Sequence, residues 1–266
     1  MPVRSKSLVL LVFFTISIVM NHSFADSCEK LSVNGADGWY PYFARQNPNH
    51  LGIMGDIVTR AADRVGLNIN LHPSIPWKRI LFNLRYGNLD IIAGALKTQQ
   101  REKQFQFSSP VHYAELRVFV RKDRSFKYSH ISDLEGKSGA KVRGMSLGQE
   151  ADDYAFSHLV IDDVPSPKSL FQMVASGRLD YGIFYWSTGK IEIDRHKLKD
   201  IIEILPSAVS KEGLYIAYSK NSKCQSQIRL LNNEIERMKG DGSIEAIIQY
   251  YHSAIASEQM ERSNDD

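Results

Sequence analysis

Residues 55–93 read GDIVTRAADRVGLNINLHPSIPWKRILFNLRYGNLDIIA, and the order of elements in this stretch decides the fold class. Apolar residues recur at helical spacing over 55–65, and a short strand pattern follows at 67–71. A second helix opens with a proline in its first turn at 76–87, and an apolar strand follows at 89–93. Strands that alternate with helices in this way favour a mostly parallel sheet with helices on both of its faces.

The same alternation starts again in the second half of the chain, after a strand at 116–121 and a polar stretch. Two α/β lobes are therefore expected, with a ligand cleft at the carboxyl ends of their strands. Strands are predicted at 141–143, 160–164, 179–184 and 214–219, and the last two helices at 225–239 and 243–253.

Composition excludes several classes of protein. The chain has 266 residues, of which 43% are apolar and 24% charged, which is typical of a globular protein. The formal charge is +3, and both signs are spread along the chain without the basic stripe of a nucleic-acid binder. A phosphate-binding loop and a Cys/His cluster at zinc spacing are both missing from the sequence, so we expect no cofactor, no metal and no nucleic-acid partner.

The first 25 residues have the pattern of a secretory signal peptide. Arg4 and Lys6 precede an apolar run at 8–20, and small residues at Ser23 and Ala25 predict cleavage after Ala25. The alternative is a membrane anchor, but the run is shorter than the roughly 20 residues that span a bilayer. Cys28 lies three residues beyond Ala25, too far for lipid attachment, so the mature protein is expected to be exported and soluble.

Two cysteines, Cys28 and Cys224, remain after the leader. An even number in an oxidising compartment suggests one disulfide, and two buried thiols are the alternative.

Eight short motifs in one order resemble those of the bacterial extracellular solute-binding proteins of family 3, the polar amino-acid type. Each motif is weak alone, and the order makes the resemblance specific over nearly the whole mature chain. The motifs are Tyr40-Pro41-Tyr42, Gly52-Ile53 with Asp56-Ile57, Gly87 to Ile92, Thr98-Gln99-Gln100-Arg101, Phe107 to Val111, Asp133 to Lys137, Gly177 to Asp180, and Met238 to Ile244. Pro76-Trp77-Lys78-Arg79 marks a subgroup whose ligands the motif does not name.

The resemblance implies the two-lobe type II periplasmic-binding-protein fold, with one lobe inserted into the other. The first lobe would consist of residues 26–118 and 213–257, and the second of residues 119–212, so that a Cys28–Cys224 bridge would lie inside one lobe. The polar residues 258–266 are expected to be a disordered tail. The implied protein is a periplasmic monomer that delivers a carboxylate-bearing solute to a membrane ABC permease or to a sensor receptor.

The same resemblance implies the anionic part of the binding site. Arg101 would take the ligand's carboxylate, because a guanidinium pairs with it bidentately, and a surface arginine at a helix start is the alternative. The turn Gly144-Met145-Ser146 precedes a helix and would offer backbone N–H groups, with Arg143 as a second cation or an exposed strand end. Gly94 and Thr98 complete this part of the predicted site.

Aromatic residues are expected to form the walls of the pocket. Tyr40, Tyr42 and Trp77 would line the first lobe, with ordinary core packing as the alternative. Trp39 is expected at the lobe surface or at the hinge. Tyr185 and Trp186 would add a wall from the second lobe.

Two positions depart from the family pattern. Tyr185 stands where the family usually has an Asp that holds the ligand's ammonium group, and Leu96 where it has a Ser that assists. An unpaired ammonium in a closed cleft costs several kcal/mol. A carboxylate with an apolar, aromatic or quaternary-amine part therefore suits these residues better than a free α-amino acid held in the usual way.

Two catalytic interpretations compete with binding. Gly144-Met145-Ser146-Leu147-Gly148 fits the G-x-S-x-G hydrolase pattern, but the preceding strand is polar and an oxyanion loop is missing. An enzyme on the same fold, such as a cyclohexadienyl dehydratase, would need Asp56, His112 or Glu212 in the cleft.

Overall fold

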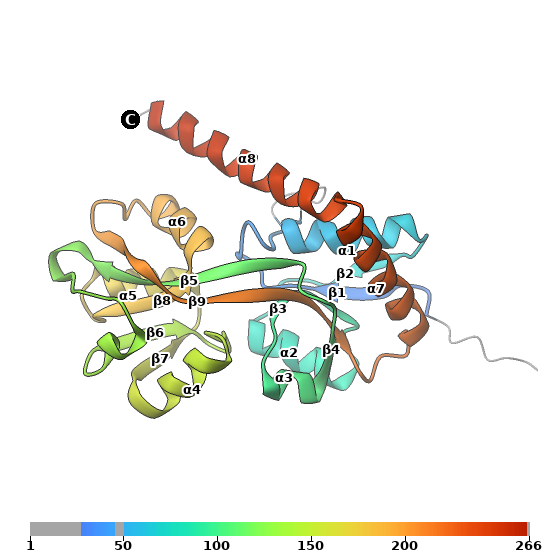
Figure 1. Ribbon diagram of the computed structural model, residues 1–266, viewed down its shortest axis with the longest axis horizontal. Coiled ribbons are helices and arrows are strands. Elements are labelled where there is room, and N and C mark those ends of the chain that lie inside the picture. Colours follow the sequence, from blue (N-terminus) through green and yellow to red (C-terminus); the bar gives the residue numbers. More distant parts are fainter. Residues whose placement is uncertain (1–27, 46–50, 265–266) are drawn as a thin grey trace, which may run out of the picture.

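Two lobes joined by two long strands make up the molecule (Figure 1). The computed structural model describes residues 28–45 and 51–264, so the expected signal peptide at 1–25 lies outside the described residues. The two long strands are β5 (His112–Arg121) and β9 (Ile202–Ser219), which pair antiparallel. Within the described ranges, none of the helices has both the length and the apolar character needed to cross a membrane.

The first lobe holds a parallel set of strands in the order β2-β1-β3, with helices on both faces. On one face α7 and α8 pack against α1, and on the other Ile80 and Leu84 of α2 meet Ile92 of β3 and Phe105 of β4. The elements are β1 (Leu31–Asn34), α1 (Ile53–Arg64), β2 (Ile69–Leu71), α2 (Trp77–Tyr86), β3 (Ile91–Leu96), α3 (Gln99–Gln104), β4 (Phe105–Phe107), α7 (Gln225–Gly240) and α8 (Ser243–Asn264).

The second lobe repeats this plan with the strands β8, β6 and β7. Its core includes Phe171, whose ring meets Phe119 and Phe184 edge to face at 5.2 and 5.8 Å between centroids. The elements are η1 (Lys122–Arg124), η2 (Ile131–Leu134), β6 (Ser138–Val142), α4 (Gln149–His158), β7 (Val160–Val164), α5 (Pro167–Ala175), β8 (Tyr181–Tyr185) and α6 (Trp186–Arg195).

The sheets of the two lobes are hydrogen-bonded into one nine-stranded sheet rather than separated. β9 pairs with β3 and β4 in the first lobe and with β5 over most of its length, and β5 pairs with β8 in the second lobe. The expected strands 116–121 and 214–219 are therefore parts of longer strands. The predicted lobe boundaries, 118/119 and 212/213, fall inside β5 and β9.

A serine–aspartate pair joins neighbouring parallel strands in each lobe. In the first, the backbone N–H and hydroxyl of Ser32 donate to Asp90 Oδ2 at 2.8 and 2.6 Å. In the second, the same two groups of Ser138 donate to Asp180 Oδ2 at 2.8 and 2.9 Å. The two Gly-x-Leu-Asp motifs thus have the same structural role, to align strand starts.

A disulfide joins Cys28 and Cys224, whose Cα atoms lie 5.3 Å apart. It ties the segment before β1 to the residue that precedes α7, and both segments belong to the part of the fold that contains α1. The bridge closes a loop across 196 positions of sequence.

The helix α8 continues to Asn264, into the residues 258–266 that were expected to form a disordered tail, and the last two of these residues lie outside the described part of the chain. Residues 243–264 contain neither Gly nor Pro, so nothing in the sequence ends the helix near Ser253, where the prediction placed its end.

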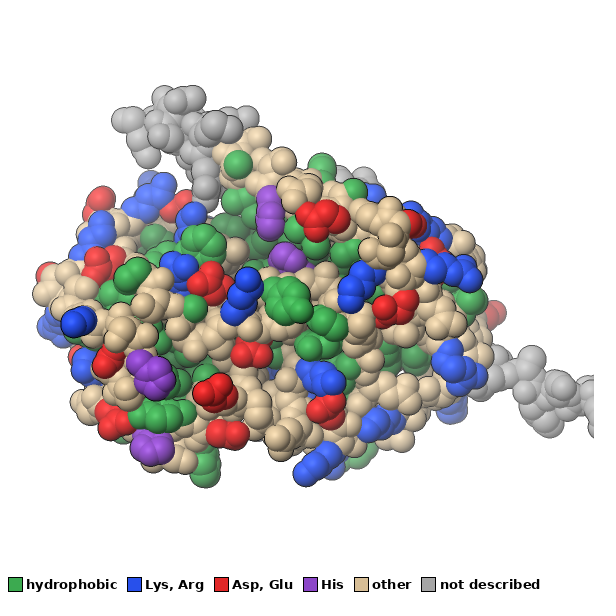
Figure 2. Space-filling view, in the orientation of Figure 1, with side chains coloured by type: hydrophobic (Ala, Val, Ile, Leu, Met, Phe, Trp, Pro, Cys, Tyr) green, Lys and Arg blue, Asp and Glu red, His purple; other side chains and the backbone are tan. Residues whose placement is uncertain are grey.

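Figure 2 shows Lys, Arg, Asp and Glu side chains scattered over the visible face, without segregation of one sign.

Candidate ligand-binding site

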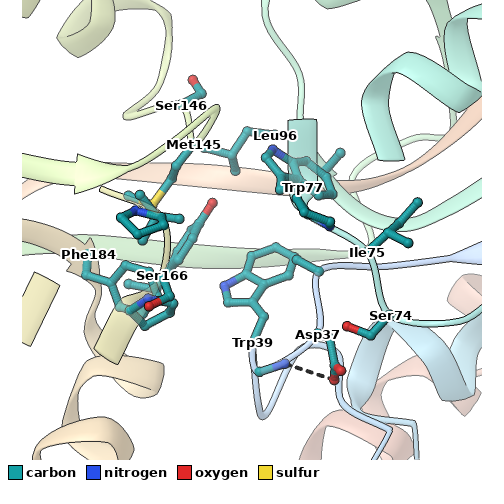
Figure 3. Close-up of a pocket in the computed structure, with 18 of the residues that line it drawn as sticks. Asp37, Trp39, Ser74, Ile75, Trp77, Leu96, Met145, Ser146, Ser166 and Phe184 are labelled. Atoms are coloured by element: carbon teal, nitrogen blue, oxygen red, sulfur yellow. Dashed lines mark hydrogen bonds between the residues drawn. The ribbon is translucent and has the colours of Figure 1, made fainter. Parts of the chain in front are cut away.

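A cavity of about 380 Å³ lies between the lobes and is lined by side chains from both (Figure 3). Its described walls are mainly apolar, with the cation of Arg101, the carboxylate of Asp37 and a few hydroxyl groups. The first lobe contributes Trp39, Ser74, Ile75, Trp77, Leu96 and Arg101, and the second contributes Val142, Met145, Ser146, Ser166, Phe184 and Tyr185.

Arg101 lies at the junction of the two lobes. Thr98 caps α3 by accepting a hydrogen bond from the backbone N–H of Arg101 at 3.2 Å, which fixes the start of that helix. The guanidinium donates through Nη1 to the carbonyl oxygen of Leu96 at 2.7 Å and through Nη2 to that of Gly144 at 3.0 Å. One side chain therefore contacts the backbone of both lobes.

Arg101 is partly buried, and its guanidinium has no ion pair within the described residues. Burial lowers the pKa of its guanidinium, while the nearby Tyr185 and Asp152 oppose that shift. An arginine stays charged even so, because its ordinary pKa is above 12. The two carbonyl oxygens occupy two of its five N–H donors, which leaves donors and an unbalanced charge for an anion.

The Gly144–Ser146 turn is held across the cleft by a second donor. The indole Nε1 of Trp77 donates to the carbonyl oxygen of Gly144 at 3.0 Å, the same oxygen that Arg101 uses. A Cβ on Gly144, whose φ is +78°, would lie 3.2 Å from Trp77 Cδ1, so this approach suits a glycine.

The helix that follows the turn already carries an internal anion. The Asp152 carboxylate accepts from the Ser146 hydroxyl and from the backbone N–H of Leu147, the latter at 2.9 Å. The hydroxyl of Ser146 in turn accepts from the backbone N–H of Gly148 at 3.1 Å. Ser146 lines the cavity as expected, but its hydroxyl is committed to protein partners.

Leu96 and Tyr185, the two departures from the family pattern, both line the cavity. Burial raises the pKa of the Tyr185 phenol, and the positive charge of Arg101 opposes that shift. Tyr185 is therefore a neutral wall where a carboxylate is usual.

The remaining predicted site residues do not line the cavity. Arg143 is exposed, and its guanidinium is directed to the carbonyl oxygen of Asp163, 3.4 Å from Nη2. Trp186 packs under Arg117, whose guanidinium carbon is 4.6 Å from the ring centroid. Tyr40 faces Tyr251 at 6.1 Å between ring centroids.

Two further predicted residues support the wall from behind. Tyr42 is buried with its ring centroid 5.0 Å from that of Trp39. Gly94 has a φ of +100°, and a Cβ there would lie 2.9 Å from Trp39 Cζ3. The sequence interpretation placed both in direct contact with ligand; in the structure both lie against Trp39, which lines the cavity, and neither is itself among the lining residues.

Trp39 itself corrects the prediction that it lies at the lobe surface or hinge. It is 5% exposed, lines the cavity, and its ring centroid is 4.8 Å from that of Tyr185 in the other lobe. Four further lining residues, Ser74, Ile75, Ser166 and Phe184, were not predicted from the sequence. Ser166 is the N-cap of α5 and Phe184 belongs to β8, and nothing in their sequence pattern distinguishes a core or capping residue from one that lines a cavity.

The sequence comparison identifies the family. The family model of bacterial extracellular solute-binding proteins, family 3, matches residues 31–254, most of the chain. The chain belongs to this family. Two relatives of the solute-binding protein come from Bacillus subtilis. One, named "Probable amino-acid-binding protein YxeM", is 21% identical over 248 residues and 90% of each chain. The other, the arginine-binding extracellular protein ArtP, is 23% identical over 256 residues, which cover 91% of this chain and 96% of ArtP.

Solved structures agree on the fold of the solute-binding protein. A mutant of ArgBP from T. maritima superposes with a TM-score of 0.72 at 21% identity, covering 86% of this chain and 97% of that one. A histidine kinase sensor domain with similarity to periplasmic binding proteins gives 0.72 at 19%, with 84% and 95% covered. The ancestral protein AncCDT-1, a precursor of cyclohexadienyl dehydratase, gives 0.64 at 23%, with 84% and 95% covered. The expected type II two-lobe fold is confirmed.

Proposed function

We propose that this solute-binding protein captures a small carboxylate-bearing solute, an amino acid or a similar compound, in the cavity between its lobes. It acts in the periplasm as a monomer and delivers the solute to an ABC-type permease. The amino-acid-binding relatives YxeM and ArtP support this class of ligand.

The partly buried Arg101 guanidinium carries this proposal. It lines the cavity, bonds to carbonyl oxygens of both lobes, and has no carboxylate partner among residues 28–45 and 51–257. A buried cation is costly unless an anion approaches it. A ligand carboxylate supplies that anion and forms a charge-assisted, planar pair with the remaining N–H donors.

Contacts between the lobes explain how binding would be signalled. Gly144 receives Trp77 and Arg101 from the first lobe, and Gln149 Oε1 accepts from the backbone N–H of Gln99 at 3.0 Å. A ligand that touches both walls would add to these contacts in the closed form and not in the open one. Such differential affinity is what shifts a population toward closure, and a membrane partner would recognise the closed form.

The placement of titratable groups favours binding over catalysis. Asp56 is held by Tyr251 at 2.9 Å, His112 faces His252, and Glu212 lies against Gly148, so none of the three lines the cavity. Ser146 donates to Asp152 rather than to a histidine, which removes the hydrolase arrangement. That none of these three groups is among the described lining residues supports binding over the dehydratase alternative.

A thermal-shift screen of the chain from Asp26 onward tests the proposal. The panel contains amino acids, betaines, polyamines, dicarboxylates and aromatic acids, and each hit is incubated with protein and analysed by mass spectrometry. We expect stabilisation by carboxylates without turnover. Formation of a product would instead establish an enzyme, and stabilisation by polyamines alone would refute the carboxylate assignment.

A further inference from the structure

We infer that the solute is a carboxylate that carries an oxygen acceptor in place of an α-ammonium group, on an apolar or aromatic body, as in a 2-oxo acid. The inference rests on the proposed function, since it specifies the ligand of the same cavity. It follows from the balance of donors and acceptors around that cavity.

Acceptors for an ammonium group are scarce among the lining residues. Asp37 is the one carboxylate on the described part of the wall, and it is exposed at the rim. It accepts from the backbone N–H of Gly38 at 3.0 Å and faces Arg45 at 3.9 Å. In Figure 3, Asp37 and Ser74 lie together, away from Met145 and Phe184.

Two further carboxylates, Asp152 and Glu212, lie near Tyr185, but neither of them lines the cavity. Asp152 lies behind Ser146 and is already bonded to the Ser146 hydroxyl and the Leu147 N–H. Leu96 and Tyr185, which do line the cavity, offer no negative charge. An ammonium enclosed there would lose its hydration without an ionic partner, which costs several kcal/mol.

Donors are in excess on the same walls. Arg101 has N–H groups left for the carboxylate, and Trp39 presents a second donor. The Trp39 side chain is 5% exposed, and its indole Nε1 has no hydrogen-bond partner among the described residues. Figure 3 shows this nitrogen on the side of the ring that faces Ser166 and Phe184. Buried donors in folded proteins almost always have a partner, so an acceptor from the ligand is the expected one.

The rest of the cavity fits an uncharged body. Ile75, Trp77, Val142, Met145 and Phe184 form apolar walls. A volume of about 380 Å³ is at the small end of the range for small-molecule sites, roughly 300–1,000 Å³. A side chain of the size of leucine or phenylalanine, attached to the carboxylate end, satisfies both conditions.

Calorimetry with matched pairs of compounds tests the inference. The pairs are phenylpyruvate against L-phenylalanine and 4-methyl-2-oxopentanoate against L-leucine, with 3-phenylpropanoate as the compound that lacks both groups and L-arginine as reference. In the wild-type protein each oxo acid is expected to bind at least tenfold more tightly than its amino counterpart.

Two variants separate the causes. The double variant Leu96→Ser, Tyr185→Asp restores an ammonium site and should shift the binding preference at least tenfold toward the amino acids. If the double variant does not fold, Leu96→Ser alone should shift the preference in the same direction. Trp39→Phe keeps an aromatic ring in the wall and removes the N–H, so phenylpyruvate should lose three- to tenfold more affinity than 3-phenylpropanoate.

Equal or tighter binding of the amino acids by the wild type would overturn the inference. The absence of detectable binding by both members of every pair would overturn it as well. In either case the proposed function stands if L-arginine or another amino acid binds in a manner that Arg101→Ala abolishes. If no carboxylate of the panel binds, the proposed function falls together with the inference.

Discussion

Arg101 Nη2 donates a hydrogen bond to the carbonyl oxygen of Gly144, 3.0 Å away, and so joins the first lobe to the second. The same guanidinium lines the cavity, so the residue that would bind the solute also belongs to the contact that closes the cleft. Recognition and closure are thereby expected to be coupled through one side chain.

Trp77→Phe should weaken solute binding by about 0.5–1.5 kcal/mol, the net value of one hydrogen bond. The substitution keeps the aromatic wall and removes the donor to Gly144, which Nε1 reaches at 3.0 Å. Calorimetry measures the affinity, and small-angle scattering of the unliganded variant should show a more open average shape. Trp186→Phe is the control, because Trp186 packs under Arg117 away from the cavity. Equal effects of the two variants would contradict the cross-lobe role of Trp77.

Gly94→Ala should lower the free energy of unfolding by about 1–3 kcal/mol and also weaken binding. The new Cβ would lie 2.9 Å from Trp39 Cζ3 and 3.0 Å from Met54 Cγ, so Trp39 must move out of the wall. Gly66→Ala is a matched control, because Gly66 also has a positive φ, +67°, but has open space around it. It should cost backbone strain of about 1–2 kcal/mol and leave binding unchanged. Urea unfolding and calorimetry give both quantities, and unchanged binding by Gly94→Ala would show that Trp39 is not a wall of the site.

Replacing Cys28 and Cys224 together by Ser should lower the free energy of unfolding by about 3–5 kcal/mol in the chain-entropy model. The reason is the length of the closed loop, 196 positions. Solute affinity should not change, since neither cysteine lines the cavity. Unfolding curves of the wild type with and without reductant check the same prediction, and identical midpoints would refute it.

The sequence predicted the fold class and the elements around the two parallel strand sets, because helical and strand periodicities are local. It did not predict the full length of β9, whose burial pattern changes along its course from partly exposed at the crossover to buried in the first lobe. A strand that passes between two lobes has no single buried face, so period-two alternation is lost.

Site residues could be predicted where a side chain suited to binding also lies in a recognisable motif, and could not be predicted where no motif marks the position. Arg101, Trp77, Ser146 and Tyr185 line the cavity as proposed from sequence, because each belongs to a motif at the end of a strand or the start of a helix. Trp39 was predicted at the lobe surface or hinge. Trp39, Tyr40 and Tyr42 lie within four residues of one aromatic loop, and the fold of the loop decides which ring faces the cleft.

The stability of the protein should fall as the pH decreases from about 6.5 to about 4. Burial and, to a smaller extent, the neighbouring His252 lower the pKa of His112, Glu245 opposes both, and the resulting pKa is about 4. Between those values the unfolded chain binds a proton that the folded protein does not, so acid favours unfolding. The loss should be on the order of 1–3 kcal/mol, allowing for the exposed part of the ring.

His112→Gln should remove that part of the pH dependence in urea unfolding measured at pH 7 and pH 4. His158→Gln, at an exposed position on α4, should keep it. Parallel pH profiles for the wild type and His112→Gln would contradict the assignment to His112.

The central claim is that a solute carboxylate binds Arg101 in the cavity between the lobes, and a calorimetric titration of three proteins tests it most directly. The wild type, Arg101→Ala and Arg143→Ala are titrated with the carboxylate that stabilises the wild type most. We expect one site per chain, a loss of about 2–5 kcal/mol of binding free energy in Arg101→Ala, and no change in Arg143→Ala, whose side chain is exposed and outside the cavity. Unchanged affinity in Arg101→Ala would contradict the account, because the solute would then bind without this guanidinium or at another place on the protein.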